Sequence, residues 1–156
     1  MKILVTGKKG YIGSSLISKL DSTTGVGRDD FDLTDRESTN NYFKDKYFDV
    51  ILHTAICGGS RLKEDENDVL ANNIKMFYNL MANAHKFKQL ISLGSGAELN
   101  WPSDPYGLSK LIIADTISSH SKLNNIRIFG VFDKNELDTR FIKTCLTQYK
   151  NKQPMV

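Results

Sequence analysis

A chain of 156 residues with 40% hydrophobic residues can build one complete core but not two ordinary domains, so we expect a single domain over residues 1–156. The net charge of +3 does not indicate a nucleic-acid partner, no apolar run reaches membrane-spanning length, and the N-terminus has no signal-peptide pattern, which together predict a cytoplasmic protein. The two cysteines, Cys57 and Cys145, lack the spacing of a zinc site or a disulfide framework, so no metal is expected.

The first predicted strand, 2–6, runs into the glycine turn TGKKGYIG. Gly7 permits a tight turn, Gly10 lets the backbone approach phosphates, and Gly13 lets the following helix pack closely on the strand. Unpaired amides at the start of that helix would face an anion. Three glycines also fit an ordinary turn, but their place after the first strand favours a dinucleotide pyrophosphate site.

Apolar segments alternate with helical ones along the rest of the chain. Thr34 and Glu37 have capping-box spacing, which predicts a helix start at Thr34, and Asp104 before Pro105 predicts another N-cap. The last helix is expected to turn five apolar residues inward, namely Phe141, Ile142, Cys145, Leu146 and Tyr149. The predicted strands are 2–6, 24–27, 49–54, 88–93 and 126–129, and the predicted helices are 11–20, 34–47, 64–86, 105–119 and 138–150.

This alternation predicts an α/β fold of Rossmann type. Parallel strands joined by right-handed crossovers form a doubly wound sheet with helices on both faces, in three layers. Ligands bind beyond the carboxyl ends of such strands. The glycine turn and the residues after Thr54, Leu93 and Phe129 are therefore expected to share one edge of the sheet.

A serine, a tyrosine and a lysine at this edge form a candidate catalytic group. Ser95 follows the strand 88–93, and Tyr106 and Lys110 share one face of the helix 105–119. A free tyrosine titrates near ~10, so it needs a neighbouring cation to act as an acid or base near neutral pH. Such pairs also occur by chance on solvated helices, and a serine in a turn is common. Their occurrence after a dinucleotide turn favours catalysis.

Five segments in this order resemble the short-chain dehydrogenase/reductase superfamily, in its extended branch of nucleotide-sugar epimerases, dehydratases and reductases. Within the branch, HTAICGG and LGSG are most similar to GDP-fucose synthase, and GRDDFDLTD is similar to dTDP-4-dehydrorhamnose reductase. The segments cover nearly the whole chain and are TGKKGYIG, DVILHTA, NNIKMFYNLM with Asn73 and Asn79, LGSG and YGLSK.

The resemblance implies hydride transfer with an NAD(P) cofactor on a nucleotide-activated sugar. Tyr106 would exchange a proton with the substrate oxygen, Ser95 would donate a hydrogen bond to it, and Lys110 would stabilise the phenolate and bind the nicotinamide ribose. The implied cofactor-binding residues are Gly7, Lys9, Gly10, Tyr11, Ile12, Gly13, Arg28, Asp32, Leu33, His53, Thr54, Ala55, Asn73, Tyr106 and Lys110.

Charges near the end of the second strand bear on the choice of dinucleotide. Lys9 and Arg28 stand where cations suit the 2′-phosphate of NADP, which is the expected cofactor. Asp29 is close enough to offer the carboxylate that NAD prefers, so NAD is the alternative. Both cations also fit an ordinary solvated surface.

Four further residues follow the family pattern around the cofactor. By resemblance, Asp32 and Leu33 form the acidic and apolar pair beside the adenine, although Asp32 also fits a simple turn former. His53 is expected to pack beneath the cofactor rather than to transfer protons. Ala55 is the small residue that leaves room for the cofactor.

The chain also departs from the family pattern. Ten residues separate Ser95 from Tyr106, fewer than usual, so the contacts with a sugar must differ. Ala97 stands where GDP-fucose synthase has its epimerisation cysteine, which argues against ring epimerisation by that route. The chain ends at Val156, where the family continues into its substrate domain. We therefore expect that domain to be absent, in a fragment or in a natural minimal protein.

Two functions from different classes stay open. The first is an NADP(H)-dependent oxidoreductase that uses Ser95, Tyr106 and Lys110 on a nucleotide sugar. The second is a cofactor-binding module, or a catalytically idle member that needs a partner chain to complete its substrate site. Retention of all three residue types favours the first, and loss of the substrate domain favours the second.

A homodimer is expected through the helices 64–86 and 105–119, which extended members of the family commonly use for this purpose. Apolar residues occur beyond one stripe of each helix, and a symmetric partner would cover them, although broader contacts within the chain would also do so. These residues are Met76, Tyr78 and Leu80 on the first helix and Leu111, Ile112 and Ile113 on the second.

Overall fold

A computed structural model describes residues 1–60, 65, 68–100, 103–133 and 136–154. Within these ranges parallel strands form one sheet in the order β2-β1-β3-β4-β5, which confirms the predicted α/β fold of Rossmann type. The strands are β1 (Ile3–Thr6), β2 (Thr23–Val26), β3 (Phe48–His53), β4 (Phe87–Ser95) and β5 (Leu123–Ile128). The helices are α1 (Tyr11–Lys19), α2 (Arg36–Phe43), α3 (Val69–Ala82), α4 (Ala97–Asn100), α5 (Pro105–Ser118) and α6 (Phe141–Lys150), with a 3-10 turn at Ala84–Lys86.

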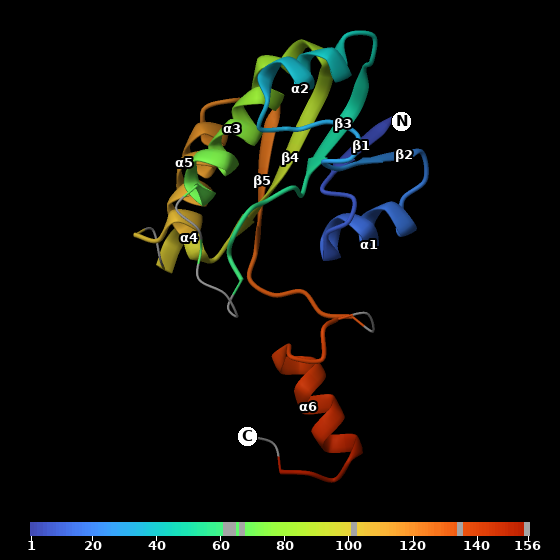
Figure 1. Cartoon of the computed structure of the whole chain (residues 1–156), viewed down its shortest axis with the longest axis vertical. Coiled ribbons are helices and arrows are strands. Elements are labelled where there is room, and N and C mark those ends of the chain that lie inside the picture. Colours follow the sequence, from blue (N-terminus) through green and yellow to red (C-terminus); the bar gives the residue numbers. More distant parts are fainter. Residues whose placement is uncertain (61–64, 66–67, 101–102, 134–135, 155–156) are drawn as a thin grey trace.

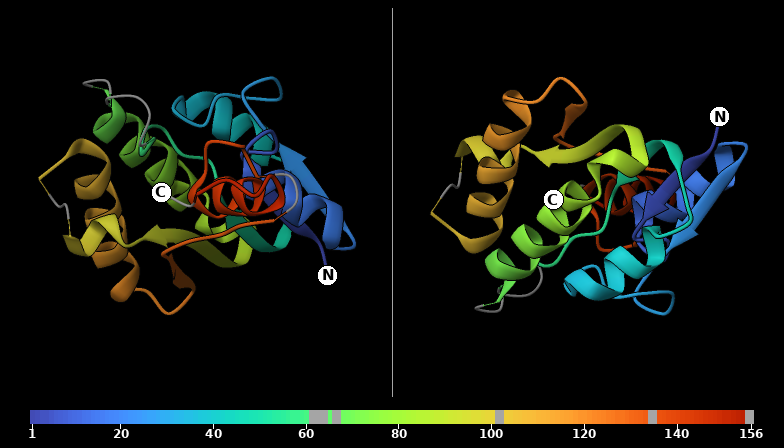
Figure 2. Two further views of the ribbon diagram at one scale, coloured as in Figure 1. Left: turned by 90° about the horizontal axis from the view of Figure 1, so that it is seen from below. Right: turned by 90° about the horizontal axis from the view of Figure 1, so that it is seen from above.

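The direction of the crossovers places helices on both faces of the sheet. From β1 to β2 the chain moves one way across the sheet, and from β2 through β3 and β4 to β5 it moves the other way. Because such crossovers are right-handed, α1 lies on one face and α2, α3 and α5 lie on the other (Figures 1 and 2). The core lies mainly between the sheet and these three helices and includes Leu4, Phe43, Ile51, Phe77, Leu80, Phe87, Leu90, Ile113 and Ile117.

The chain beyond β5 leaves the three layers, and Figure 1 shows α6 projecting away from the sheet. None of its residues is buried, and Phe141 and Tyr149 are 72% and 73% exposed. The prediction that Phe141, Ile142, Cys145, Leu146 and Tyr149 point into a core is therefore wrong. An apolar stripe shows that a helix face is suited to burial, but it does not specify what covers that face.

The start of α2 differs from the predicted capping box. The N-cap is Asp35, whose carboxylate accepts a 2.7 Å hydrogen bond from the Ser38 amide. Thr34 instead precedes the cap, and its hydroxyl and its amide both donate to Oδ1 of Asp32, at 2.8 Å each. The helix also ends at Phe43, before the predicted Tyr47.

Part of the apolar surface that was expected to face a second copy is buried within the chain. Met76 and Leu80, expected on the outer face, are 5% and 0% exposed and belong to the core. Of the other apolar residues named for a dimer, Ile113 is buried, whereas Tyr78 and Leu111 are 45% and 39% exposed. The surface that a second copy could cover is therefore narrower than predicted. Of the predicted start of this helix, residues 64, 66 and 67 lie outside the described residues.

The N-cap of α5 is confirmed. The Asp104 carboxylate accepts a 2.6 Å hydrogen bond from the Gly107 amide, and Pro105 occupies the first turn. This cap satisfies a helix-end amide that would otherwise lack a partner. It thereby fixes the first turn of the helix that carries Tyr106.

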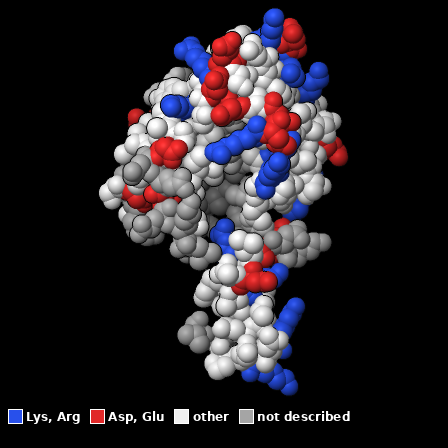
Figure 3. Space-filling view, viewed as in Figure 1, with Lys and Arg blue, Asp and Glu red and all other residues white. Residues whose placement is uncertain are grey.

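Charged side chains of both signs interleave over the face shown in Figure 3. This agrees with the small net charge of +3. In the described ranges, no helix combines the length and the apolar character needed to cross a membrane. The face in view therefore presents no broad field of one sign.

Candidate functional site

The carboxyl ends of β1, β2 and β3 surround a cavity of about 800 Å³, a size typical of small-molecule and cofactor sites. The predicted cofactor residues that line it are Gly7, Lys9, Gly10, Arg28, Asp32, Leu33, Thr54 and Ala55. The structure does not place Tyr11, Ile12, Gly13, His53, Asn73, Tyr106 or Lys110 among the lining residues.

The glycine turn can exist only without side chains at two of its positions. Gly7 has a φ of +77°, and a Cβ there would lie 2.9 Å from the Ala55 backbone. A Cβ at Gly13 would lie 2.3 Å from the Gly7 carbonyl oxygen and 2.8 Å from Oγ1 of Thr54. At Gly10 a Cβ would meet only the Gly7 oxygen, at 3.2 Å. Gly7 and Gly13 are thus required by packing, whereas a Cβ at Gly10 would make only one tight contact.

The N-terminus of α1 is suited to an anion. Its N-cap is Gly10, and no side chain caps the helix. The first amides of a helix have no partners within the helix, and the helix dipole favours negative charge there. A cradle without Cβ atoms beside such a helix end fits the pyrophosphate of a dinucleotide.

A buried hydrogen-bonded group joins the ends of β1 and β3. The Thr6 hydroxyl lies 2.9 Å from Nδ1 of His53 and accepts a hydrogen bond from the Ala55 amide, while the Thr54 hydroxyl donates to the Thr6 carbonyl at 2.6 Å. Burial, assisted by the charge of Lys110, lowers the pKa of His53 to about 3. His53 is therefore neutral near pH 7 and acts as a packing residue under the site.

The end of β2 carries a network of ion pairs. Nζ of Lys8 lies 2.7 Å from Asp30 and 3.0 Å from Asp29, and Nζ of Lys9 lies 3.4 Å from Asp29. The lysines lower the pKa of both carboxyls, and the two aspartates raise the pKa of Lys8. Lys9 is thus paired rather than free. The ion pair between Lys8 and Asp30 was not predicted, because these residues lie 22 positions apart in the sequence.

Arg28 extends from the same strand end toward the loop after β3. One of its terminal nitrogens lies 3.6 Å from Sγ of Cys57. Arg28 and Cys57 both line the cavity. Among the predicted cofactor cations, Arg28 is therefore the one that faces the cavity without a carboxylate partner in the described residues.

Asp32 forms a turn, which was one of the two roles predicted for it. Its Oδ1 accepts from the amide and the hydroxyl of Thr34, which lowers its pKa. The following Leu33 is 7% exposed, and its carbonyl accepts a 2.8 Å hydrogen bond from Asn79. Because Asp32 and Leu33 also line the cavity, the turn places both residues at its wall.

Asn73 holds the loop after β3 instead of reaching the cavity. Its side chain is 1% exposed, accepts from the Cys57 amide at 2.8 Å, and donates to the Cys57 carbonyl at 3.1 Å and to the Ser109 hydroxyl at 3.0 Å. These contacts use both of its donor hydrogens. The amide thus positions Cys57 relative to α5, and the predicted contact with a cofactor is not supported by its location.

Tyr11 does not line the cavity either. Its hydroxyl donates a 3.0 Å hydrogen bond to Asp133, in the segment after β5. Burial and the Asp133 carboxylate raise the pKa of Tyr11. The side chain therefore ties the glycine turn to the C-terminal segment, and only the helix start at Tyr11 and Ile12 borders the anion cradle.

Ser95, Tyr106 and Lys110 come together at the ends of β4 and α5. Ser95 ends β4, and its hydroxyl oxygen accepts a 3.1 Å hydrogen bond from the Ala97 amide. Nζ of Lys110 lies 5.8 Å from the centre of the Tyr106 ring and donates to the Leu93 carbonyl at 2.5 Å. A Cβ at Gly59 would lie 2.7 Å from the Tyr106 ring, so the loop after β3 packs directly on it.

Burial sets the electrostatics of this group. It raises the pKa of Tyr106, and a hydrogen-bonding interaction with Ser95 opposes this rise. Burial lowers the pKa of Lys110 to about 8, and the charge of Glu98 opposes this fall. Lys110 therefore remains largely protonated near pH 7, so a cation lies next to a phenol that can act as an acid.

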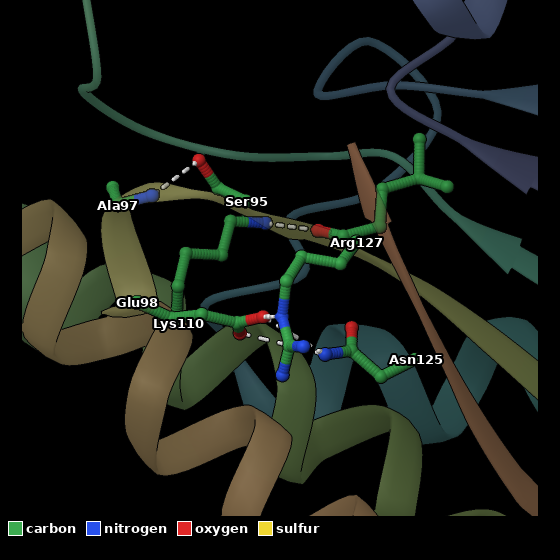
Figure 4. A network of polar contacts seen from close by, with 7 residues as sticks. Ser95, Ala97, Glu98, Lys110, Asn125 and Arg127 are labelled. Atoms are coloured by element: carbon green, nitrogen blue, oxygen red, sulfur yellow. Dashed lines mark hydrogen bonds and ion pairs between the residues drawn. The ribbon is translucent and has the colours of Figure 1, made fainter. Parts of the chain in front are cut away.

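A buried carboxylate behind Ser95 was not predicted. Glu98 is 2% exposed and accepts hydrogen bonds from Nε of Arg127 and, at 3.4 and 3.5 Å, from Nδ2 of Asn125 (Figure 4). A single glutamate in a polar turn gives no signal of burial. The only available hint is that Asn125 and Arg127 alternate along β5 and therefore share a face.

Solved structures with low sequence identity share this fold. A GDP-mannoheptose C4 reductase from Campylobacter jejuni, solved with NADP bound, is 19% identical with a TM-score of 0.74, over 95% of this chain and 56% of its own. A dTDP-4-dehydrorhamnose reductase from Clostridium acetobutylicum is 20% identical with a TM-score of 0.77, over 97% and 60%. An L-threonine dehydrogenase from Phytophthora infestans is 18% identical with a TM-score of 0.79, over 96% and 62%.

The present chain thus spans between about half and three fifths of the length of these proteins. No curated protein matches it significantly in sequence. The model of the NAD dependent epimerase/dehydratase family matches residues 3–156, which is almost the whole chain. The chain therefore belongs to the NAD dependent epimerase/dehydratase family.

Proposed function

We propose that this protein is an NADP(H)-dependent oxidoreductase that acts on a nucleotide-activated sugar. The observation that carries the proposal is the placement of Ser95, Tyr106 and Lys110 at the sheet edge that also holds the glycine cradle. Gly7 and Gly13 let the backbone of this cradle pack closely, since a Cβ at either would meet protein atoms, and Gly7 and Gly10 line the cavity. When bound, such a cofactor supplies or accepts a hydride.

The residues of this chain would manage the proton and the charge on the substrate oxygen. In the direction of reduction, the Tyr106 hydroxyl gives its proton to that oxygen, and the ammonium of Lys110 stabilises the phenolate that remains. The Ser95 oxygen accepts from the Ala97 amide, so its own proton, which interacts with Tyr106, can turn to donate to the same substrate oxygen. Oxidation runs the same proton path in reverse.

Direct turnover tests this proposal. The protein is mixed with NADPH and a panel of nucleotide 4-keto sugars while the absorbance of the reduced nicotinamide is followed. We expect oxidation of NADPH with at least one sugar, and loss of that activity in Tyr106→Phe. L-Threonine with NAD belongs in the panel, because a threonine dehydrogenase shares the fold. Activity with that pair alone would contradict the sugar assignment.

The preference for NADP rests on the arrangement at the end of β2. Asp29, which would otherwise attract the ribose hydroxyl of NAD, is paired with Lys8 and Lys9. Arg28 lines the cavity and makes no ion pair in the described ranges, and its charge helps to lower the pKa of Asp32. This leaves its guanidinium for a 2′-phosphate.

Calorimetry at one salt concentration measures this preference. NADP should bind more tightly than NAD, and Arg28→Ala should remove about 1–3 kcal/mol of the difference, as expected for a charge-assisted contact. Arg36→Ala, at the exposed start of α2, is the matched control and should leave the difference unchanged. Equal affinities for the two cofactors in the unmodified protein would remove the basis for this preference.

A cofactor-binding module without turnover is the second candidate. One observation favours it: the residues that line the cavity come from the cofactor side and do not include Ser95, Tyr106 or Lys110. Tight binding of NADP together with no turnover on any member of the panel would select this alternative.

We also propose a homodimer through α3 and α5. These helices pack together, the Tyr78 hydroxyl lies 3.0 Å from that of Thr116, and Tyr78 and Leu111 remain half exposed. A twofold partner would cover both side chains with the same surface. Sedimentation of a monomer alone at every concentration tested would contradict the dimer.

A further inference from the structure

The turn after β4 contains a carboxylate that the proposed chemistry does not use. Glu98 lies three residues after Ser95, and its side chain is 1% exposed, whereas that of Arg127 is 43% exposed. A glutamate is rarely so deeply buried unless it is paired. In Figure 4 the Glu98 carboxylate points toward Arg127 and Asn125 of β5. The pair therefore places its negative end inside and its positive end toward solvent.

Two features of the sheet prepare the position for this carboxylate. Asn125 and Arg127 are two residues apart on β5, so their side chains share a face. Gly94 of β4 pairs in register with Arg127, and a Cβ on Gly94 would lie 2.6 Å from Oδ1 of Asn125. The glycine thus makes room for the Asn125 side chain, whose Nδ2 then reaches Glu98.

Among the described residues, none forms a direct ion pair with Lys110. Its ammonium donates to the Leu93 carbonyl. The titratable groups around it are Tyr106 on its own helix, His53 from β3 and Glu98 from α4, which packs on α5. His53 is neutral, so among these groups Glu98 supplies the negative charge that acts on Lys110.

We propose that Glu98 is a positioning residue for the Ser95, Tyr106 and Lys110 group. Anchored by Arg127 and Asn125, it supplies the counter-charge that keeps Lys110 an ammonium beside Tyr106. It also fixes the turn whose Ala97 amide orients the Ser95 hydroxyl. This role rests on the proposed function for its effect on turnover, but its effect on Lys110 can be measured without any substrate.

The pKa of Lys110 in two variants distinguishes this electrostatic role from a purely structural one. In Glu98→Gln, Lys110 and Arg127 remain as two cations without a carboxylate, so the pKa of Lys110 should fall below its value of about 8. In the double variant Glu98→Gln/Arg127→Met one cation is also gone, so part of that fall should be reversed. A purely structural role predicts no such recovery, because the double variant loses more contacts.

NMR titration of lysine labelled at Cε and Nζ measures the pKa of Lys110 in each protein. The Lys110→Met variant identifies its signal. Glu37→Gln, on the exposed side of α2, is the matched control and should leave the Lys110 signal unchanged. If Glu98→Gln does not fold, the double variant must still titrate at a lower pH than the unmodified protein. This readout is decisive because Glu98 also raises the pKa of Tyr106, so a kinetic profile combines two effects.

Turnover adds a second readout where the substrate panel gives activity. The decline of kcat at high pH should begin at lower pH in Glu98→Gln and return toward its original position in the double variant, with KM for the sugar little changed. An unchanged Lys110 titration in Glu98→Gln, or a lower one in the double variant than in the single, would overturn the proposal. Absence of turnover with the expected Lys110 titrations would reject the proposed function alone.

Discussion

The turn after β1 and the turn after β4 lie at the same edge of the sheet, but they are stabilised by different means. At the first, missing side chains allow backbone to pack on backbone, as the 2.3 Å separation between a Gly13 Cβ and the Gly7 oxygen demonstrates. At the second, the buried side chains of Glu98 and Lys110 are held by hydrogen bonds and an ion pair. Steric fit thus shapes the turn proposed to hold the cofactor, whereas buried charges and hydrogen bonds shape the turn proposed to carry the reaction.

The substitution Tyr106→Phe should lower kcat strongly without weakening cofactor binding. Tyr106→Phe removes the proton donor and keeps the ring that packs on Gly59. We expect kcat to fall by about 10²–10⁴-fold, with the Kd of the cofactor nearly unchanged. Steady-state kinetics and calorimetry on the same preparation measure both quantities. A parallel loss of affinity would mean that the two turns are not separable.

A smaller effect is expected from a substitution in the glycine turn after β1. Gly13→Ala forces a Cβ into the Gly7 backbone and the Thr54 hydroxyl, so we expect a loss of about 1–3 kcal/mol in the free energy of unfolding, together with weaker cofactor binding. Gly130→Ala is the matched control, because a Cβ there would meet nothing within 4 Å. Equal stabilities of the two variants in urea unfolding would show that the cradle is not tightly packed.

A buried histidine between the two turns should make the fold sensitive to acid. The pKa of His53 is lowered to about 3 in the folded protein, whereas an unfolded histidine titrates near about 6.5. Below that value the unfolded state gains a proton that the folded state does not, so stability falls as the pH falls. The expected slope from His53 is about 1.4 kcal/mol per pH unit.

Urea unfolding between pH 7 and about pH 5 measures this slope, in a range above the titration of most carboxyl groups. His53→Gln should flatten it, and the exposed His85→Gln should not. An unchanged slope in His53→Gln would show that His53 is protonated in the folded protein.

The smallest effect is expected in α6, which lies away from both turns (Figure 1). Leu146 is 52% exposed, so Leu146→Ala should change the free energy of unfolding by less than about 0.5 kcal/mol. Leu80 is 0% exposed, so the same substitution at this buried leucine, Leu80→Ala, should lower the free energy of unfolding by about 2–5 kcal/mol. A large loss of stability in Leu146→Ala would mean that α6 supports the domain after all.

The parts of the molecule that were predictable from sequence depend on local rules. The glycine turn, the Asp104 cap of α5 and the order of strands and helices follow from neighbouring residues alone. The Thr34 capping box had the right spacing, but Asp32 binds both polar groups of Thr34, and Asp35 then caps the helix instead. Competition between adjacent polar side chains is not visible in a spacing rule.

Contacts between distant segments account for the rest. The apolar stripe of α6 predicted burial, but nothing in the described part of the chain packs over Phe141 or Tyr149. Asn73 matches a family motif, yet its amide is occupied by Cys57 and Ser109. A stripe or a motif identifies a residue that needs a partner, and only the fold determines which partner it meets.

Transfer of a deuterium label from the cofactor tests the role of Tyr106 most directly. The protein and its Tyr106→Phe variant are each incubated with NADPH deuterated at the transferred position and with the sugar found in the panel, and the products are analysed by mass spectrometry. Both proteins should bind the cofactor with similar affinity, and the unmodified protein alone should transfer deuterium to the sugar at an appreciable rate. Undiminished transfer by Tyr106→Phe would contradict the assignment of the reacting group.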